Sequence, residues 1–161
     1  MKLALLILED ERPVREALKR DLAAFARHLR IEEAEDVPTA LEVIEEIDAA
    51  GDRLALVLAD HRLPGTSGVD FLIDLAVDDR AFATRKVLVT GQADQDDTIR
   101  AINEAGLDRY VAKPWTADAL RELVRDQLTE FVLAAGVDPL PHLAVLDAER
   151  ALSIVGERGD L

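Results

Sequence analysis

The sequence predicts an α/β protein in which a doubly wound, parallel sheet of five strands is covered by five helices on its two faces. Short apolar runs that suit buried strands alternate with longer segments whose apolar residues recur at helical spacing. Proline and glycine mark most of the junctions between these segments. Such alternation favours a parallel sheet, because each right-handed crossover places a helix against one face.

The first half of the chain begins with an unbroken apolar run over residues 3–8, which fits a strand buried on both faces. Pro13 suits the first turn of the following helix, where its missing N–H costs nothing. Residues 31–34 are predicted as a short strand, and Pro38 opens a second helix that closes near Gly51. The apolar residues at helical spacing in the first helix are Val14, Leu18, Leu22, Phe25 and Leu29.

The second half continues the alternation and ends with the longest helix. Residues 61–67 are predicted as a loop because they contain Pro64 and Gly65. Gly106 and Gly136 each end a predicted helix. The predicted strands cover 54–59, 87–89 and 109–112, and the predicted helices cover 69–77, 94–105 and 116–135.

The excess of acidic side chains limits the kinds of molecule that the chain is expected to bind. The chain has 33 acidic and 19 basic side chains and a formal net charge of −14. Such a field repels nucleic-acid phosphates and suits a divalent cation or a basic surface on another protein, although the charge is also explained by solubility alone. Cysteine is absent, so neither disulfides nor thiolate chemistry is expected.

The sequence gives little sign of a membrane or export segment. No stretch is long and apolar enough to span a bilayer. The apolar run at 3–8 could be taken for part of a signal peptide, but it is short, meets acidic residues at once and lacks a small-residue cleavage site. We therefore expect a buried strand there and a cytoplasmic protein.

Polar side chains follow four of the predicted strands at the point where each strand ends. Glu9 and Asp10 follow the first strand, Asp60 the third, Thr90 the fourth and Lys113 the fifth. Ligands of open parallel sheets bind outside the carboxyl ends of the strands, so neighbouring strands would bring these side chains to one shallow cleft. Each residue alone is also explained as a loop residue, a cap or a surface charge, and the prediction rests on their combination.

This combination suits the transfer of a phosphoryl group. Crowded carboxylates repel each other, and Mg²⁺, which prefers oxygen ligands, supplies the missing counter-charge. Asp60 can then attack phosphorus as a carboxylate nucleophile and form an acyl phosphate. Lys113 and Thr90 can hold phosphate oxygens, so that catalysis consists of positioning and charge stabilisation.

Several short segments carry a wider pattern: Ile7-Leu8-Glu9-Asp10-Glu11, Leu58-Ala59-Asp60, Leu63-Pro64-Gly65 with Gly68, Val89-Thr90-Gly91, and Tyr110 with Lys113-Pro114-Trp115. In these segments the sequence resembles the receiver domains of bacterial two-component response regulators, of the chemotaxis-regulator type. The resemblance covers roughly residues 3–130. It implies a flavodoxin-like sheet with strand order 2-1-3-4-5, and a phosphoryl group passed to Asp60 from a phosphohistidine of a sensor kinase.

The resemblance also implies the ligands of a magnesium ion. Asp10, Asp60 and the backbone carbonyl of Arg62 would hold Mg²⁺, with Glu9 nearby through a water molecule. Glu9 stands where many family members have aspartate, a variation that should preserve metal binding.

Further roles follow from the same resemblance. Thr90 is expected to move toward the phosphoryl group, with Tyr110 turning inward behind it, and the Lys113–Pro114 bond is expected to be cis. Arg62 and Gln92 occupy positions that tune the lifetime of the phosphate. Arg62 is unusual there, and a cation beside the phosphate is expected to slow or alter dephosphorylation.

The sequence does not indicate a functional role for any of the three histidines. His28 lies on a predicted helix, but a histidine phosphotransfer protein would be all-helical, and this chain has clear strands. His61 and His142 lie in predicted loops and form no metal-binding spacing with each other.

The division predicted for the chain is a receiver over 1–135 and an extension with a short helix over 136–161. Gly136–Pro141 is expected to be an extended linker, and Asp147 is expected to cap a helix over 148–155 with Leu152 and Val155 on one face. The apolar content favours packing on the chain itself or on a dimer partner, and the alternative is a linker from a longer protein.

The sequence is compatible with three functions. The first is a switch, without further enzymatic activity, that is phosphorylated by a histidine kinase or phosphotransfer protein and read by a downstream protein on the face formed by 94–105, 109–112 and 116–135. The sequence leaves the oligomeric state open, with this face or the extension as the surface that a homodimer would use, and neither nucleic acid nor membrane is expected as a partner. The second is a dehalogenase-type phosphohydrolase, which needs an acid where Arg62 stands. The third is a pseudo-receiver that binds a partner without phosphorylation.

Overall fold

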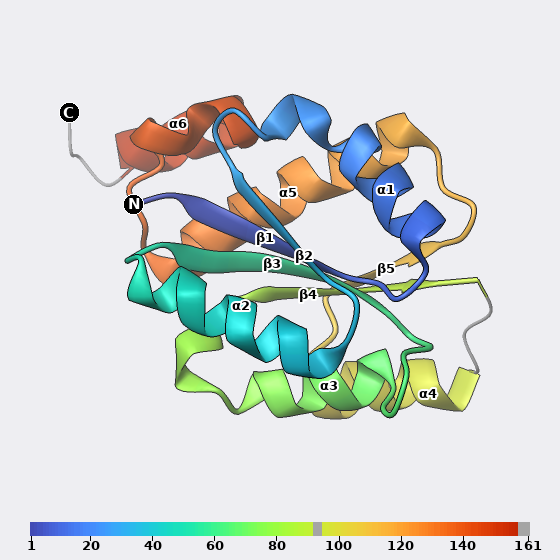
Figure 1. The fold of residues 1–161 in the computed structure, drawn as a ribbon. Coiled ribbons are helices and arrows are strands. Elements are labelled where there is room, and N and C mark those ends of the chain that lie inside the picture. The colour runs from blue at the N-terminus through green and yellow to red at the C-terminus, as the bar shows by residue number, and fades with distance from the viewer. Residues whose placement is uncertain (92–94, 158–161) are drawn as a thin grey trace.

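The computed structural model, which describes residues 1–91 and 95–157, contains one parallel sheet of five strands (Figure 1). The strand order is β2-β1-β3-β4-β5, and every neighbouring pair is parallel. The predicted flavodoxin-like architecture is therefore confirmed. The strands are β1 Leu3–Leu8, β2 Arg30–Ala34, β3 Arg53–Asp60, β4 Arg85–Thr90 and β5 Arg109–Ala112.

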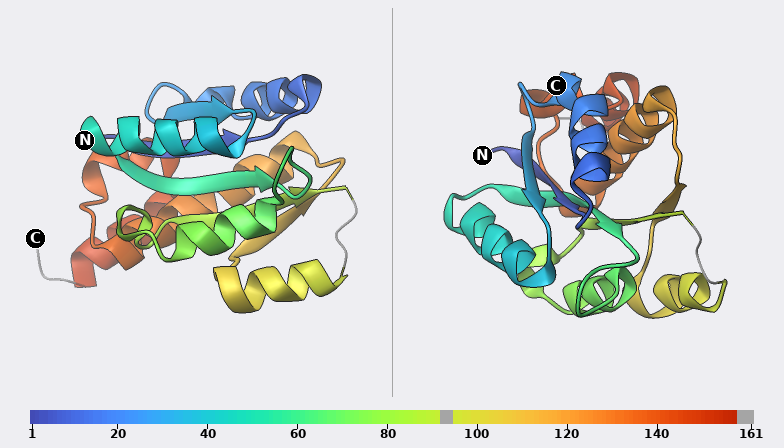
Figure 2. Two further views of the ribbon diagram at one scale, coloured as in Figure 1. Left: turned by 60° about the horizontal axis from the view of Figure 1, so that its bottom comes forward. Right: turned by 45° about the vertical axis from the view of Figure 1, so that its right-hand side comes forward.

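Helices cover both faces of the sheet (Figures 1 and 2). Helices α1 (Arg12–Asp21), α5 (Ala117–Ala135) and α6 (Ala148–Glu157) lie on one face. Helices α2 (Val37–Ala49), α3 (Gly68–Ala76) and α4 (Gln95–Arg100) lie on the other, and a π-helical turn over Ala101–Ala105 continues α4. The central strands are therefore buried between two layers.

The unbroken apolar run of β1 packs against the helices on both faces of the sheet. Leu3, Leu5 and Ile7 pack in the core shared with α1 and α5, whereas Leu6 and Leu8 pack in the core shared with α2 and α3. All six residues of β1 are fully buried. Side chains of a strand alternate between faces, so a strand covered on both sides has no polar position.

The first helix is shorter than the apolar spacing predicts. It ends at Asp21, and a 3₁₀ turn at Ala23–Phe25 follows, although Leu22, Phe25 and Leu29 are buried as predicted. Two side chains supply hydrogen-bond donors to the last residue of α1. Arg121 of α5 donates to the carbonyl of Asp21 at 3.2 Å, and Trp115 Nε1 donates to the Asp21 carboxylate at 2.8 Å. Spacing of three or four residues does not separate an α-helix from an α-helix that continues as 3₁₀ turns.

The proline-containing end of the segment after α5 is helical, so the extended linker predicted over Gly136–Pro141 is wrong from Pro139 onward. Pro139 has helical dihedral angles, and η4 (Leu140–Val145) is a 3₁₀ helix that includes Pro141. Proline fixes φ near a helical value and lacks only an N–H that the first turn does not use, so it suits this position as well.

The extension packs on its own chain. Val145, Leu146 and Ala151 are buried in the core on the α1 and α5 face. Val155 is buried as well, whereas Leu152, three residues before it on α6, is 48% exposed, so only Val155 of this pair packs on the chain. The predicted cap is present, since the Asp147 carboxylate accepts from the Arg150 backbone N–H at 3.2 Å.

Polar contacts join the extension to α5. Arg125 donates to the carbonyls of Ala144 and Leu146 at 3.2 and 2.9 Å. The fully buried Thr129 hydroxyl donates to the Arg125 carbonyl at 2.8 Å and accepts from the Asp147 N–H at 2.9 Å. The second half of α5 is therefore covered by the same chain. Among the described residues, no helix combines the length and apolarity needed to cross a bilayer.

Candidate functional site

The carboxyl ends of β1, β3 and β5 bring three acidic residues and one amine together. Carboxylate oxygens of Glu9, Asp10 and Asp60 lie within 4.8 Å of one another. Lys113 Nζ lies 3.3 Å from Glu9 Oε1 and 3.2 Å from Asp60 Oδ1. The cluster thus contains three carboxyl groups and one ammonium, which contacts two of them, and acidic groups are in excess.

Burial shapes the electrostatics of this cluster. Glu9 is 1% exposed, and its Oε2 is buried without a hydrogen-bond partner among the described residues. Burial, followed by the hydrogen bond and charge of Asp60, raises the pKa of Glu9 to about 8. Burial alone would lower the pKa of Lys113, but the charges of Asp60 and Glu9 raise it. The orphaned oxygen and the raised acid pKa indicate a place for a further cation.

The donor set fits a hard divalent ion. Three carboxylates from Glu9, Asp10 and Asp60 converge without a histidine or a cysteine among them. Carboxylate oxygens with room for water molecules are the ligands that Mg²⁺ prefers. The predicted Mg²⁺ ligands with carboxylate groups are therefore close enough together to share one ion.

The backbone around Asp60 is fixed on both sides. The N–H of His61 donates to the carbonyl of Val89 at 3.3 Å, and the carbonyl of His61 accepts from the N–H of Gly68 at 2.8 Å. A Cβ on Gly68 would lie 2.0 Å from the Asp60 carbonyl oxygen, closer than any real contact. Glycine is therefore required where α3 begins, because the helix start lies directly against the end of β3.

An open cavity of about 420 Å³ lies over these strand ends. Thr90, the last residue of β4, is buried, and the N–H of Lys113 donates to its carbonyl at 3.0 Å. The Lys113–Pro114 bond is cis, as predicted. The residues that line the cavity are Glu11, Asp60, Arg62, Thr90, Gly91 and Lys113.

Not every predicted site residue lines this cavity: Glu9 and Asp10 belong to the carboxylate cluster but are not among the lining residues. Tyr110 is 58% exposed on β5 and does not line the cavity. Gln92 lies outside the described residues. Arg62 lines the cavity, and its backbone forms a bridge with Ser67 across the β3–α3 loop.

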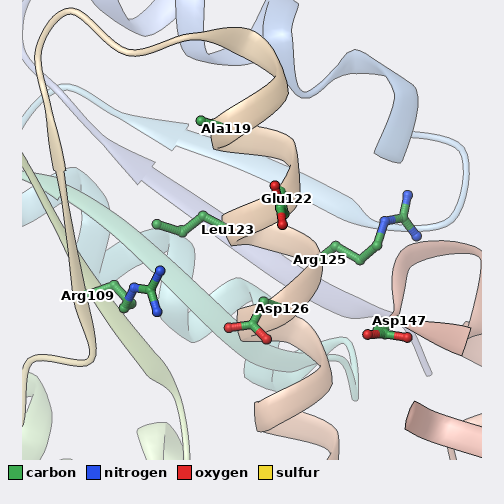
Figure 3. A pocket seen from close by; sticks show the side chains of 7 residues that line it. All are labelled: Arg109, Ala119, Glu122, Leu123, Arg125, Asp126 and Asp147. Carbon is green, nitrogen blue, oxygen red and sulfur yellow. The ribbon is translucent and has the colours of Figure 1, made fainter. Parts of the chain in front are cut away.

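A second cavity, of about 460 Å³, lies beside α5 (Figure 3). Arg109 from β5 lies on one side of it, and Arg125, Asp126 and Asp147 lie toward the extension. The last three already bond within the chain: Arg125 to Leu146, Asp126 to Arg150, and Asp147 to the start of α6. The side chains that line this second cavity carry charges of both signs, and most of them are already paired. The cavity therefore lacks a cluster of like-charged groups such as the one at the strand ends.

His61 is a residue whose contact the sequence did not reveal. Its Nε2 lies 3.0 Å from Asp97 Oδ2 on α4. The partners are separated by 36 positions along the chain. No local spacing signals such a contact, and only the placement of α4 next to the β3–α3 loop brings the two side chains together.

Comparison with known proteins agrees with this geometry. The chain matches the response regulator receiver domain family over residues 5–125. It is 30% identical over 120 residues to the chemotaxis protein CheY of Pseudomonas aeruginosa, covering 74% of this chain and 91% of that protein. It is 29% identical over 153 residues to the hydrogenase transcriptional regulatory protein HoxA of Cupriavidus necator, covering 95% of this chain and 29% of that protein.

The chain therefore spans less than a third of the length of HoxA. Among solved structures, a CheY-like response regulator receiver domain protein from Methanospirillum hungatei superposes with a TM-score of 0.67 at 25% identity, covering 81% of this chain and 97% of that one. The family match covers most of the chain and includes Asp60, Thr90 and Lys113. The chain belongs to the response regulator receiver domain family.

Proposed function

We propose that this chain is a phosphorylation-controlled receiver, in which Asp60 accepts a phosphoryl group from the phosphohistidine of a sensor kinase or phosphotransfer protein. The observation that carries the proposal is the Asp60 carboxylate in an open cavity, 3.2 Å from Lys113 and clustered with Glu9 and Asp10. A nucleophile, a fixed cation and a set of metal ligands are the parts that phosphoryl transfer to a carboxylate requires.

The transfer is an in-line exchange at phosphorus. An oxygen of Asp60 forms the new P–O bond as the P–N bond to the donor imidazole breaks, and the imidazole nitrogen keeps the electron pair and takes up a proton. Asp10, Asp60 and the backbone carbonyl of Arg62 would hold Mg²⁺, with Glu9 nearby. The bound ion would neutralise charge on the transferring phosphoryl oxygens.

Lys113 and Thr90 act on the product. The Lys113 ammonium, freed from one carboxylate oxygen of Asp60, pairs with a phosphoryl oxygen, and the Thr90 hydroxyl donates to another. Thr90 is buried at the end of β4, and Tyr110 is exposed on the adjacent β5. We expect phosphorylation to draw Thr90 toward the phosphoryl group and Tyr110 inward, which changes the α4–β5–α5 face for a downstream protein or a second copy of the chain.

Arg62 and Gln92 are proposed to set the lifetime of the phosphate. Arg62 lines the cavity and offers a cation that pairs with phosphoryl oxygens and hinders attack by water. We expect Arg62→Ala to shorten the half-life of the acyl phosphate, and Arg62→Lys to retain part of the effect. Equal half-lives in all three proteins would remove this role from Arg62.

The remaining parts of the proposal concern the whole chain. Residues 1–135 form the receiver, and 136–161 form an extension. The protein acts in the cytoplasm on protein partners, without direct binding to nucleic acid or membrane. It has no enzymatic activity besides its own phosphorylation and dephosphorylation.

One experiment separates the alternatives. The chain is incubated with Mg²⁺ and acetyl phosphate, and its intact mass is measured alongside that of Asp60→Asn. We expect a gain of one phosphoryl group that Asp60→Asn abolishes. Absence of an adduct without turnover of the donor favours the pseudo-receiver, and rapid multiple turnover without an adduct favours a hydrolase.

A further inference from the structure

The residue that follows Asp60 contacts α4 directly. His61 Nε2 lies 3.0 Å from Asp97 Oδ2, and the His61 side chain is only 11% exposed. Its second ring nitrogen, Nδ1, is buried and has no hydrogen-bond partner within the described part of the chain. The ring is therefore oriented by one polar contact, and that contact belongs to α4.

The backbone of His61 is joined to two other elements. Its N–H donates to the carbonyl of Val89 on β4, and its carbonyl accepts from the N–H of Gly68 at the start of α3. With the side-chain contact to Asp97, this one residue links the end of β3 to β4, α3 and α4. A shift of the peptide between Asp60 and His61 therefore reaches α4 through the His61 side chain and its contact with Asp97.

Helix α4 is held mainly by polar contacts in its described part. None of the side chains from residues 97–100 is buried, and Ile99 is 48% exposed. Arg100 pairs with Asp70 of α3, one turn beyond the contact of Asp97 with His61. Fully buried side chains begin only at Ala101, in the π-helical turn. The position of α4 thus depends on a few contacts whose individual energies are modest.

We propose that His61 is a positioning residue that couples the occupancy of Asp60 to the position of α4. This inference rests on the function proposed above and concerns the regulation of the same site. A phosphoryl group on Asp60 adds charge and volume beside the peptide whose nitrogen belongs to His61. The imidazole ring carries the resulting displacement to Asp97, whereas Arg100 pairs with Asp70 of α3 and, within the described residues, does not contact the residue after Asp60.

The test is hydrogen exchange of the full-length chain, followed in peptides that cover residues 97–105, with and without Mg²⁺ and acetyl phosphate. The variants are His61→Ala, Asp97→Ala and the conservative His61→Gln, whose amide nitrogen can replace Nε2 as the donor. Arg100→Ala is the matched control, because it removes a different polar contact of α4, the pair with Asp70 of α3. His28→Ala controls for the loss of an exposed histidine. Intact mass gives the phosphorylated fraction in each sample.

Without the phosphodonor, we expect His61→Ala and Asp97→Ala each to accelerate exchange in this segment about tenfold, as for the loss of one hydrogen bond. The double variant should be no faster than either single variant. With the phosphodonor, the wild-type chain and Arg100→Ala should show a change in exchange on phosphorylation. His61→Ala should lose this change at an equal phosphorylated fraction, and His61→Gln should recover it.

Two results would overturn the inference. One is a phosphorylation-dependent change that persists in His61→Ala, and the other is its loss in Arg100→Ala as much as in His61→Ala. If no protein forms an adduct, the proposed function fails instead. In that case the exchange rates measured without the donor still decide whether His61 holds α4.

Discussion

Glu9 is expected to make the stability of the metal-free protein depend on pH. Its side chain is 1% exposed, and one carboxyl oxygen has no partner among the described residues. Burial, followed by the hydrogen bond and charge of Asp60, raises the pKa of Glu9 from 4.5 to about 8 in the folded chain. Between these values the folded protein keeps a proton that the unfolded chain releases.

Stability must then fall as the pH rises, because the unfolded state binds fewer protons than the folded state in this window. The slope approaches ~1.4 kcal/mol per pH unit for one proton. Across the window from 4.5 to about 8, the loss is on the order of 4 kcal/mol. Lys113 stays charged throughout the window, because the carboxylates raise its pKa, and it adds no slope there.

The substitution Glu9→Gln tests this reasoning, because glutamine has nearly the size of the neutral acid and does not ionise. Urea unfolding in EDTA between about pH 5 and about pH 8 should show the wild-type chain losing stability and the variant losing much less. Near pH 8 the variant should be the more stable protein. Mg²⁺ should restore the wild-type chain, because a cation favours the ionised carboxylates.

Glu42→Gln on the exposed surface of α2 is the matched control and should behave as the wild-type chain does. An equal pH slope in Glu9→Gln and the wild-type chain would refute the reasoning, since the proton would then be bound elsewhere.

Further predictions concern packing around the site and the extension. Gly68→Ala should destabilise the chain by at least ~2 kcal/mol in urea unfolding, because the new Cβ would lie 2.0 Å from the Asp60 carbonyl oxygen. Gly156→Ala, which meets open space, should cost nothing comparable, and equal costs would contradict the steric argument. Thr129→Val should cost ~1–3 kcal/mol by leaving the Asp147 N–H unpaired. Thr129→Ser keeps the hydroxyl, and if it unfolds as easily as Thr129→Val, the hydrogen bond is not the cause.

The sheet was predictable because its strands carry unambiguous patterns. Buried central strands require unbroken apolar runs, and β1 and β3 have them. The position of the site was predictable for a related reason. The carboxyl ends of parallel strands lie at one edge of the sheet, so the residues that follow these strands, Glu9, Asp60 and Lys113, lie close together.

The errors arose where local patterns have two structural solutions. Apolar spacing is similar in an α-helix and in an α-helix followed by 3₁₀ turns, so the end of α1 at Asp21 was missed. Proline suits both extended backbone and the first turn of a helix, so Pro139–Pro141 was misassigned. The contact between His61 and Asp97 depends on tertiary placement and leaves no trace in either local sequence.

Direct chemical mapping tests whether the phosphoryl group resides on Asp60. After incubation with acetyl phosphate and Mg²⁺, borohydride reduces an aspartyl phosphate to homoserine, which peptide mass spectrometry locates in the chain. We expect homoserine at position 60 and no conversion without the phosphodonor. Conversion at another carboxylate, such as Asp10, with Asp60 intact would contradict this expectation.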